Sequence, residues 1–396
     1  VQKKNFQMNR HHPKTLSLAA ISGIYIIAQV IIVPVLPELS LVFSTDYKTI
    51  QLSIGAFLLG AALVNLIAGP LSDRYGRRPI AFIFFIIFIC ASLASFFVEN
   101  IYLFIFLRFL QASCAAGMVL ARAIVGDIYS GKQATIMFGY ISMIMAIGPL
   151  IGPFLGGLIS DVLGPPQVLV FLALLGIIVF YLIITDLQET NLTKSESIIV
   201  QLKSYPLLFK SNKFWPPTLV SSFSFSVFGI FFVGGPYIAS SIYEMSASQI
   251  GVYFSFPPLG FIIGNFLAGK FSDDLSTKSF LFLGSCILTS APIALFTLSN
   301  IYEHQLAFFG PIILMTLGAG IIWPVANTAI VKAVPPLAGS ASGLSSALMV
   351  IVSALASAIV GFSLEQGNPI LKLTVVLIIV GIITIFCSLF TEKETD

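Results

Sequence analysis

Arg108 is the one charged residue that the sequence places well inside an apolar stretch, about seven residues into the run 101–121. Burying a guanidinium group in hydrocarbon costs several kcal/mol unless the group is paired or hydrated, and such residues mark substrate or ion pathways. Arg108 is therefore a candidate functional residue. The alternative is a structural arginine, or one that snorkels to the membrane surface from near the end of its span.

Proton transfer through a membrane protein usually needs a carboxylate that titrates inside the membrane. The sequence has 17 acidic residues, and none lies in the middle of an apolar stretch. Glu38 follows the run 16–36, and Asp127 follows the run 101–121 near Arg122. Arg122 is a candidate for proton coupling or gating, and so are both carboxylates. The alternative for each is a solvated loop carboxylate, because a helix end needs little to keep a carboxylate charged.

A charged turn follows the second apolar stretch and reads Gly69-Pro-Leu-Ser72-Asp73-Arg74-Tyr-Gly76-Arg77-Arg78. We expect Asp73 to lie at the positive N-terminus of a neighbouring helix, with the eleventh span as its partner. Arg74 and Arg77 would stay near the anionic inner leaflet. A charge contact made in one conformation and broken in another would bias the equilibrium between them. The alternative is a basic turn that only sets topology.

Glycines recur in the stretch 134–159, which is long enough to cross a bilayer. Glycine lets helix backbones approach closely, and proline bends the helix that contains it. The sequence therefore predicts close packing against a partner helix and a fixed kink, with a generic small-residue interface as the alternative. The pattern is G-x8-G-x3-G-P-x2-G-G, formed by Gly139, Gly148, Gly152, Pro153, Gly156 and Gly157.

Composition places these residues in a membrane protein. The chain is 57% hydrophobic and 9% charged, whereas soluble domains carry about 25% charged residues. A membrane helix needs about 20 apolar residues, and continuous apolar runs favour helices over a barrel. We expect an all-α membrane protein with twelve transmembrane helices, near 16–36, 51–71, 80–97, 101–121, 134–159, 168–185, 215–237, 249–269, 280–299, 306–330, 340–361 and 369–389.

The basic residues predict the orientation of these spans. Lys48 and Lys372 are the only Lys or Arg residues in the loops of one side, and the other side has seventeen. The positive-inside rule therefore places both termini in the cytoplasm.

An internal repeat predicts two bundles. Residues 59–73 and 259–273 share seven of fifteen positions, including an asparagine and a Ser-Asp pair. We expect two pseudo-symmetric six-helix bundles, 1–185 and 215–396, joined by a cytoplasmic linker, 186–214, that serves as a tether. Two such bundles leave a midplane site that opens to either side by rocking.

Polar and aromatic side chains inside the spans are candidates for a substrate cavity, because they are costly unless they face a cavity or each other. An aromatic wall with few polar groups suits bulky, largely apolar molecules. We also expect Gly234-Gly235-Pro236 to break the seventh span. The cavity candidates are Tyr25, Gln29, Gln111, Tyr140, Phe228, Phe232, Tyr237, Trp323 and Asn327.

Several functions are disfavoured by the sequence. Its three histidines lie in tails or loops, and its four cysteines show no C-x-x-C spacing. No phosphate-binding G-x-x-x-x-G-K-[ST] is present, and no basic patch has interleaved aromatics. We expect no enzyme, no cofactor, no metal and no nucleic-acid partner.

The turn Gly69–Arg78 resembles the signature loop of the major facilitator superfamily, and a weaker copy follows at Gly269–Lys278. Residues from Arg108 to Ala116 partly match a second signature of that family, with Ala112 and Cys114 in place of two glycines. The glycine pattern matches the antiporter signature of its drug:proton exporters.

The resemblance implies a twelve-span drug:proton antiporter similar to bicyclomycin-resistance-type exporters. In that family the counterpart of Arg108 is associated with proton transfer, and the glycine pattern packs span 5 against span 8. One position departs: such exporters can carry an acidic residue four positions before Pro34, and this chain has Val30 there.

The leading hypothesis is thus a secondary exporter in the bacterial inner membrane, a monomer that moves an amphipathic drug or metabolite outward in exchange for protons. One alternative is a dedicated exporter of one native metabolite, such as a siderophore. The other is a non-transporting membrane receptor or scaffold, which would need a large extra-membrane domain, whereas the outer loops are short.

Overall fold

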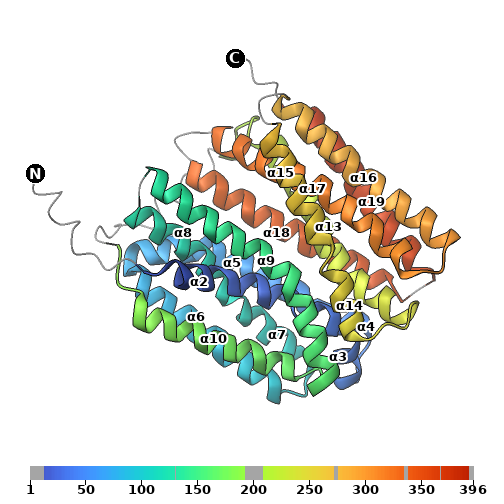
Figure 1. Ribbon diagram of the computed structural model, residues 1–396, viewed down its shortest axis with the longest axis horizontal. Helices are drawn as coiled ribbons and strands as arrows, with labels where there is room; N and C mark the ends of the chain where they lie inside the picture. Colours follow the sequence, from blue (N-terminus) through green and yellow to red (C-terminus); the bar gives the residue numbers. More distant parts are fainter. Residues whose placement is uncertain are drawn as a thin grey trace, which may run out of the picture.

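The computed structural model describes residues 13–129, 131–191, 208–271, 275–333, 338–365 and 367–391. All regular structure in these residues is helical (Figure 1). The first half contains α2 (Thr15–Val30), the short 3-10 helix η1 (Val33–Val35), α3 (Leu36–Val42), α4 (Tyr47–Ile50), α5 (Leu52–Tyr75), α6 (Arg77–Phe97), α7 (Ile101–Gln111), the 3-10 helix η2 (Ala112–Ala115), α8 (Ala116–Ile128), α9 (Gly131–Leu163) and α10 (Gln167–Asp186). The second half contains α13 (Trp215–Ser241), α14 (Ala247–Phe254), α15 (Pro257–Lys270), α16 (Thr277–Ile301), α17 (Gln305–Ala333), α18 (Ala338–Ser363) and α19 (Pro369–Leu389).

Twelve helical segments account for the predicted spans. Within the described residues, eleven segments are long and apolar enough to cross a membrane. The fifth predicted span, 134–159, lies in α9, which is 33 residues long and contains the apolar segment Ile147–Leu163. The prediction of an all-helical membrane protein is confirmed.

The fourth segment is longer than its apolar run suggested. It was predicted to end near residue 121, but α7, η2 and α8 continue the segment to Ile128. Arg122 and Asp127 therefore lie on α8 rather than beyond the span. In the last turn of α8, Asp127 pairs with Arg77 of α6.

The predicted break at Gly234-Gly235-Pro236 is wrong, because α13 is continuous through these residues. Both glycines are packing positions. A Cβ atom on Gly234 would lie 2.5 Å from Leu373, and one on Gly235 would lie 2.6 Å from Phe254. Proline is tolerated inside a membrane helix because its neighbours can satisfy the carbonyl that it leaves unpaired.

The helices form two bundles, which occupy different parts of Figure 1, the first in blue to green and the second in yellow to red. Two helix pairs carry most of the contact between them, α9 with α14 and α5 with α18. The sequence repeat relates these pairs, since it matches the span of α5 with that of α14 and α15. The approach is close in both pairs, as a Cβ atom on Gly361 of α18 would lie 2.2 Å from the side chain of Gln51.

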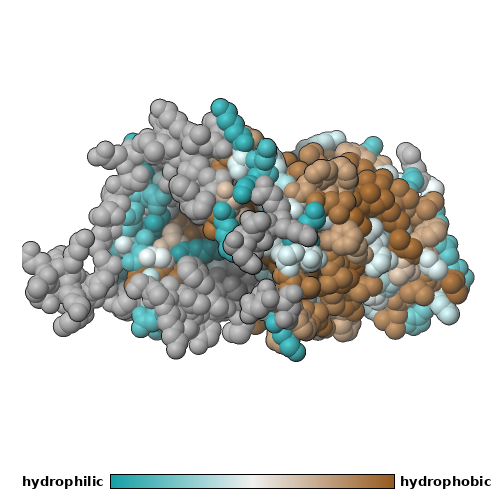
Figure 2. Space-filling view, turned by 90° about the horizontal axis from the view of Figure 1, so that it is seen from above, coloured by the Kyte–Doolittle hydropathy of each residue, from teal (hydrophilic) through white to brown (hydrophobic). Residues whose placement is uncertain are grey.

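Apolar side chains cover the flank of the molecule, and hydrophilic ones gather toward its ends (Figure 2). Large exposed residues such as Phe266, Leu355 and Phe386 lie on helices of the second bundle. Surface of this kind needs lipid to cover it. Below, the side that contains Gly69–Arg78 is called the inner side, and the side that contains Glu38 is called the outer side, following the predicted orientation.

Candidate functional site

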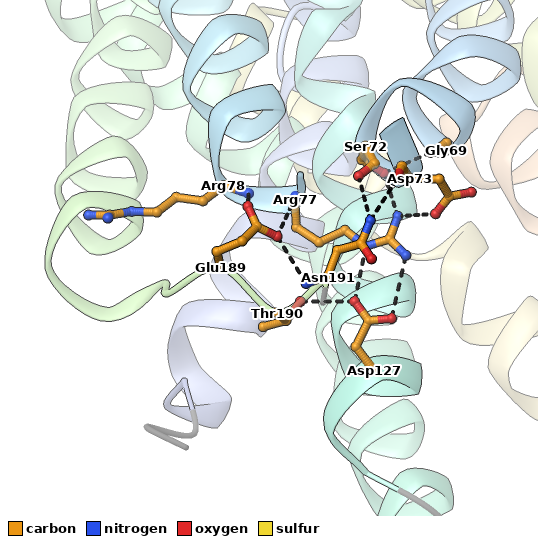
Figure 3. Close-up of polar contacts among 9 residues, drawn as sticks. All are labelled: Gly69, Ser72, Asp73, Arg77, Arg78, Asp127, Glu189, Thr190 and Asn191. Carbon is orange, nitrogen blue, oxygen red and sulfur yellow. Dashed lines mark hydrogen bonds and ion pairs between the residues drawn. The ribbon is translucent and has the colours of Figure 1, made fainter. Parts of the chain in front are cut away.

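The side chain of Arg77 is the centre of a charged network on the inner side (Figure 3). Its guanidinium donates to Ser72 Oγ at 2.6 Å and to the carboxylate of Asp73. Its Nε also donates to Asp127 Oδ2 at 3.0 Å. The side chain of Arg77 is 8% exposed, so these bonds form where water competes weakly and are worth more than surface ion pairs. They join α5, α6 and α8.

A sharp turn places Arg77 in this network. Helix α5 ends at Tyr75, and Gly76 adopts φ +107°, a conformation that a residue with a Cβ atom rarely accepts. Helix α6 then begins at Arg77, so the arginine and Asp73 are four positions apart across the turn. Backbone geometry therefore explains why a glycine, Gly76, lies between Asp73 and Arg77.

Two residues after α10 bind the same turn through its backbone. The carboxylate of Glu189 accepts from the backbone N–H of Arg77 at 2.9 Å and from that of Arg78 at 3.2 Å. Asn191 Nδ2 donates to the carbonyl oxygens of Ser72 at 3.3 Å and Asp73 at 2.8 Å. Neither residue was predicted as part of a site, because both fall in the segment expected to be a tether.

Arg108 lies on α7 and is completely buried. It donates to Gln111 Oε1 at 2.6 Å and more weakly to the carbonyl of Ala28, at 3.4 and 3.5 Å. The guanidinium carbon lies 4.6 Å from the centre of the Phe57 ring, within cation–π range. Among the described residues, no carboxylate forms an ion pair with Arg108, and its Nε is buried without a hydrogen-bond partner.

Two predicted residues, Gln111 and Tyr25, belong to the contacts around Arg108. Gln111 links Arg108 to Ser95 by donating to its hydroxyl at 3.0 Å. Tyr25 stacks on the other partner, Phe57, with ring centres 5.9 Å apart. Gln29 follows Ala28 on α2 and is buried. Arg108 is thus a buried guanidinium inside the first bundle that forms no ion pair with a described carboxylate, and it does not snorkel to the surface.

The glycines of α9 contact two different helices. Gly148, Gly152 and Gly156 face α2, where a Cβ atom on Gly156 would lie 1.9 Å from the carbonyl oxygen of Ile31. Gly157 faces α14 of the other bundle, and a Cβ atom there would lie 2.1 Å from the carbonyl oxygen of Ala247. Pro153 also meets α14, since its carbonyl lies against Gly251. The surroundings of Gly139 and Tyr140 lie outside the described side chains.

Hydrogen bonds join the two bundles on the outer side. Asp161, near the end of α9, accepts from Ser246 Oγ at 3.1 Å and from the backbone N–H of Ser248 at 3.2 Å, at the N-terminus of α14. The hydroxyl of Tyr47 donates to the carbonyl of Val233 at 2.7 Å. Together with the α9–α14 contact, these bonds join the outer ends of the two bundles.

A chain of aromatic rings runs through the second bundle. Phe228 lies 5.7 Å from Phe261 and 6.4 Å from Phe232, between ring centres, and Phe261 lies 6.0 Å from Trp323. Asn327 turns back to its own helix and donates to the carbonyl of Trp323 at 3.0 Å.

Comparison with known proteins decides the family. A model described as Major Facilitator Superfamily matches residues 18–357 and 236–395. The chain belongs to the Major Facilitator Superfamily. The fold agrees, since a D-xylose-proton symporter of known crystal structure superposes with a TM-score of 0.77 over 96% of this chain and 97% of that one, at 14% identity.

Two other proteins are similar to this chain over most of their length. An uncharacterized MFS-type transporter, YdgK, from Bacillus subtilis is 28% identical over 359 residues, which cover 89% of each chain. A bicyclomycin resistance protein homolog from Haemophilus influenzae is 24% identical over 337 residues, 82% of this chain and 83% of that one. The superfamily member is thus a multi-pass membrane transporter of small molecules and not an enzyme.

Some predicted site residues of this transporter lie apart from the others. Arg74 stacks on Tyr75 at 5.3 Å, and Arg122 is exposed on α8, whereas Asp127 pairs with Arg77. Glu38 accepts a short hydrogen bond from Ser160 near the outer side. The rings of Tyr237 and Tyr47 meet across the bundles with their centres 4.8 Å apart and their planes tilted by 49°. The predicted partner of Asp73, the N-terminus of α18, begins with residues whose side chains lie outside the described part, so that contact stays a prediction.

We predict that Arg77→Lys lowers the transport rate about 10- to 100-fold, because one ammonium group cannot bind Asp73 and Asp127 at once as the planar guanidinium does. Initial rates for any compound that the wild type carries would measure this. Arg74→Lys in the same turn is the matched control and should keep at least half of the rate. Equal losses in both variants would contradict the assignment.

Proposed function

We propose that this transporter exports amphipathic small molecules, drugs or metabolites, across a bacterial inner membrane in exchange for protons. The observation that carries the proposal is the double contact of α9, whose glycines pack on α2 within one bundle and on α14 of the other. The contact with α14 is the packing of span 5 on span 8 that the antiporter signature implies. The printed name of the Haemophilus influenzae relative, a bicyclomycin resistance protein homolog, supports a drug-like substrate.

Alternating access fits the contacts between the bundles. The outer ends are joined by hydrogen bonds of two side chains, those of Asp161 and Tyr47. Rocking of one bundle on the other would break these bonds and open the outer side. The two bundles are residues 1–185 and 215–396, joined by 186–214, and both termini are cytoplasmic. We further propose that one copy of the chain, with both bundles, works as a monomer.

The substrate would meet the aromatic wall of the second bundle. Phe228, Phe232 and Trp323 offer ring faces without fixed charges, which suits bulky apolar molecules. Proton coupling involves Arg108, whose buried charge has no carboxylate partner among the described residues. Asp127 is held in its ion pair with Arg77, so we assign it to conformational gating, and Glu38 remains the candidate proton carrier on the outer side.

Efflux from cells or inverted vesicles, with and without a proton gradient, tests the proposal. The wild type should move at least one compound of a panel of neutral and charged dyes and antibiotics, and an uncoupler should stop that movement. If no compound moves, the multidrug hypothesis fails and a dedicated metabolite exporter or a non-transporting receptor remains. If movement continues unchanged with the uncoupler, proton exchange is wrong.

Asp161→Asn tests the outer contact within this mechanism. Loss of the negative charge at the N-terminus of α14 should weaken outer closure about two- to fivefold, the size expected for a charge at a helix end. The labelling rate of a cysteine at the outer interface by an impermeant maleimide would measure the shift. Glu303→Gln, an exposed outer-loop residue, should leave the labelling rate unchanged, and an unaltered rate in Asp161→Asn would contradict the role of that contact.

A further inference from the structure

The segment that follows α10 is bound to the inner turn between α5 and α6 at several points. The docked segment, residues 186–191, begins at the last residue of α10, Asp186, whose carboxylate accepts from the backbone N–H of Lys14 at 2.7 Å. Glu189, Thr190 and Asn191 then each bind the network of Arg77 (Figure 3). The contacts come from a stretch that sequence analysis treated as a tether.

Glu189 satisfies the free end of α6. The first four N–H groups of a helix have no partner within the helix, and they carry its positive dipole end. The carboxylate of Glu189 accepts from two of them, those of Arg77 and Arg78. It fits there because Gly76 has no side chain, since a Cβ atom on Gly76 would lie 2.3 Å from Glu189 Oε2.

Asn191 satisfies the other side of the same turn. Its Nδ2 donates to two carbonyl groups in the last turn of α5, those of Ser72 and Asp73. The carbonyl of Ser72 also accepts from the backbone N–H of Gly76 at 3.0 Å. Its own N–H donates to Glu189 Oε1 at 3.0 Å, so the two residues hold each other. Thr190 Oγ1 donates to Asp127 Oδ2 at 2.9 Å, the oxygen that Arg77 Nε also contacts.

The far end of the linker is anchored to the second bundle. Leu208 and Phe214 are fully buried and pack with Ile330 of α17 and Ala341 of α18. The connection between the bundles is therefore bound to the inner side of both. Asn191 lies directly beside Asp73, to whose carbonyl oxygen it donates.

We propose that Glu189, Thr190 and Asn191 are positioning residues for the transport cycle, which hold the inner turn so that Arg77 is aimed between Asp73 and Asp127. The inference rests on the proposed alternating-access function but makes a claim about different residues. These residues touch neither the aromatic wall nor Arg108, so they set the rate of the conformational change and not the affinity for substrate.

Glu189→Gln tests this assignment with little change in size. The amide keeps one acceptor oxygen and turns a donor toward the remaining N–H group. Because a hydrogen bond to a charged acceptor corresponds to roughly a 10- to 100-fold change in an equilibrium constant, hydrogen exchange at the amides of Arg77 and Arg78 should become about tenfold faster. Glu189→Ala should speed hydrogen exchange at these amides more than Glu189→Gln does. Asn191→Ala should loosen the same turn on the side of α5.

Transport kinetics provide a second readout that a merely structural role would not reproduce. Glu189→Gln should lower kcat about five- to tenfold while KM stays within about twofold, because positioning acts on the conformational step. Glu303→Gln, which removes an exposed outer carboxylate, is the matched control and should change neither exchange nor kcat.

Two outcomes would overturn the proposal. One is wild-type exchange at Arg77 and Arg78 in all three variants, whatever their transport rate. The other is faster exchange with kcat and KM unchanged. If the wild type transports no compound at all, the proposed function fails instead, and the exchange measurement on the full-length protein still decides whether Glu189 holds the turn.

Discussion

Arg108→Gln should abolish proton-coupled export while leaving the folded protein as stable as the wild type or more so. The guanidinium is completely buried and forms no ion pair with the described carboxylates, and an uncompensated charge in a membrane interior costs several kcal/mol. Glutamine removes that cost and can still donate to Gln111. If Arg108 steers protons, the rate of export should fall at least about 100-fold, the usual lower range for losing a proton-transfer group.

The comparison of Tm and transport separates a functional arginine from a structural one. Thermal unfolding of the purified protein and export under a proton gradient would be measured on the same preparations. A structural arginine predicts that Tm and export fall together in Arg108→Gln. Arg108→Lys keeps the charge and should retain part of the proton dependence, so a lysine variant as inactive as the glutamine variant would count against the role of charge.

The fold was predictable because lipid imposes a simple rule on sequence. Runs of about 20 apolar residues mark spans, and eleven such helices together with α9 reproduce the twelve runs. The rule failed where packing or charge decided the structure. Helix α13 continues through Gly234-Gly235-Pro236 because those glycines admit Leu373 and Phe254, and α8 extends to Asp127 because that residue pairs with Arg77.

The candidate site was predictable only in part, because residue types identify candidates but do not reveal their partners. The register of Asp73 and Arg77 in the inner turn indicated a charge contact. It could not show that Asp127 completes the network, since 50 residues separate it from Arg77. The role of Glu189 could not be predicted for a related reason. Its partners are backbone N–H groups, which leave no side-chain pattern in the sequence.

The glycine pattern of α9 makes the sharpest distinction, because adjacent glycines contact different bundles. Gly156→Ala would place its Cβ atom 1.9 Å from Ile31 O, inside the first bundle. That clash cannot be relieved by rocking, so the variant should lose stability by about 1–3 kcal/mol or more, the usual cost of overpacking. A lower Tm of the purified protein would show it.

Gly157→Ala would instead place its Cβ atom 2.1 Å from Ala247 O, across the bundle interface. Separating the outer ends relieves this clash, so the same 1–3 kcal/mol should appear as a shift toward the outward-open state of roughly 5- to 150-fold. An impermeant maleimide should then label Tyr237→Cys, in a background without native cysteines, at least about five times faster, while Tm changes little. Gly55→Ala, whose Cβ atom would meet nothing within 4 Å, is the control. If Gly157→Ala lowers Tm as Gly156→Ala does and leaves labelling unchanged, the contact between α9 and α14 is a permanent part of the fold rather than a gate.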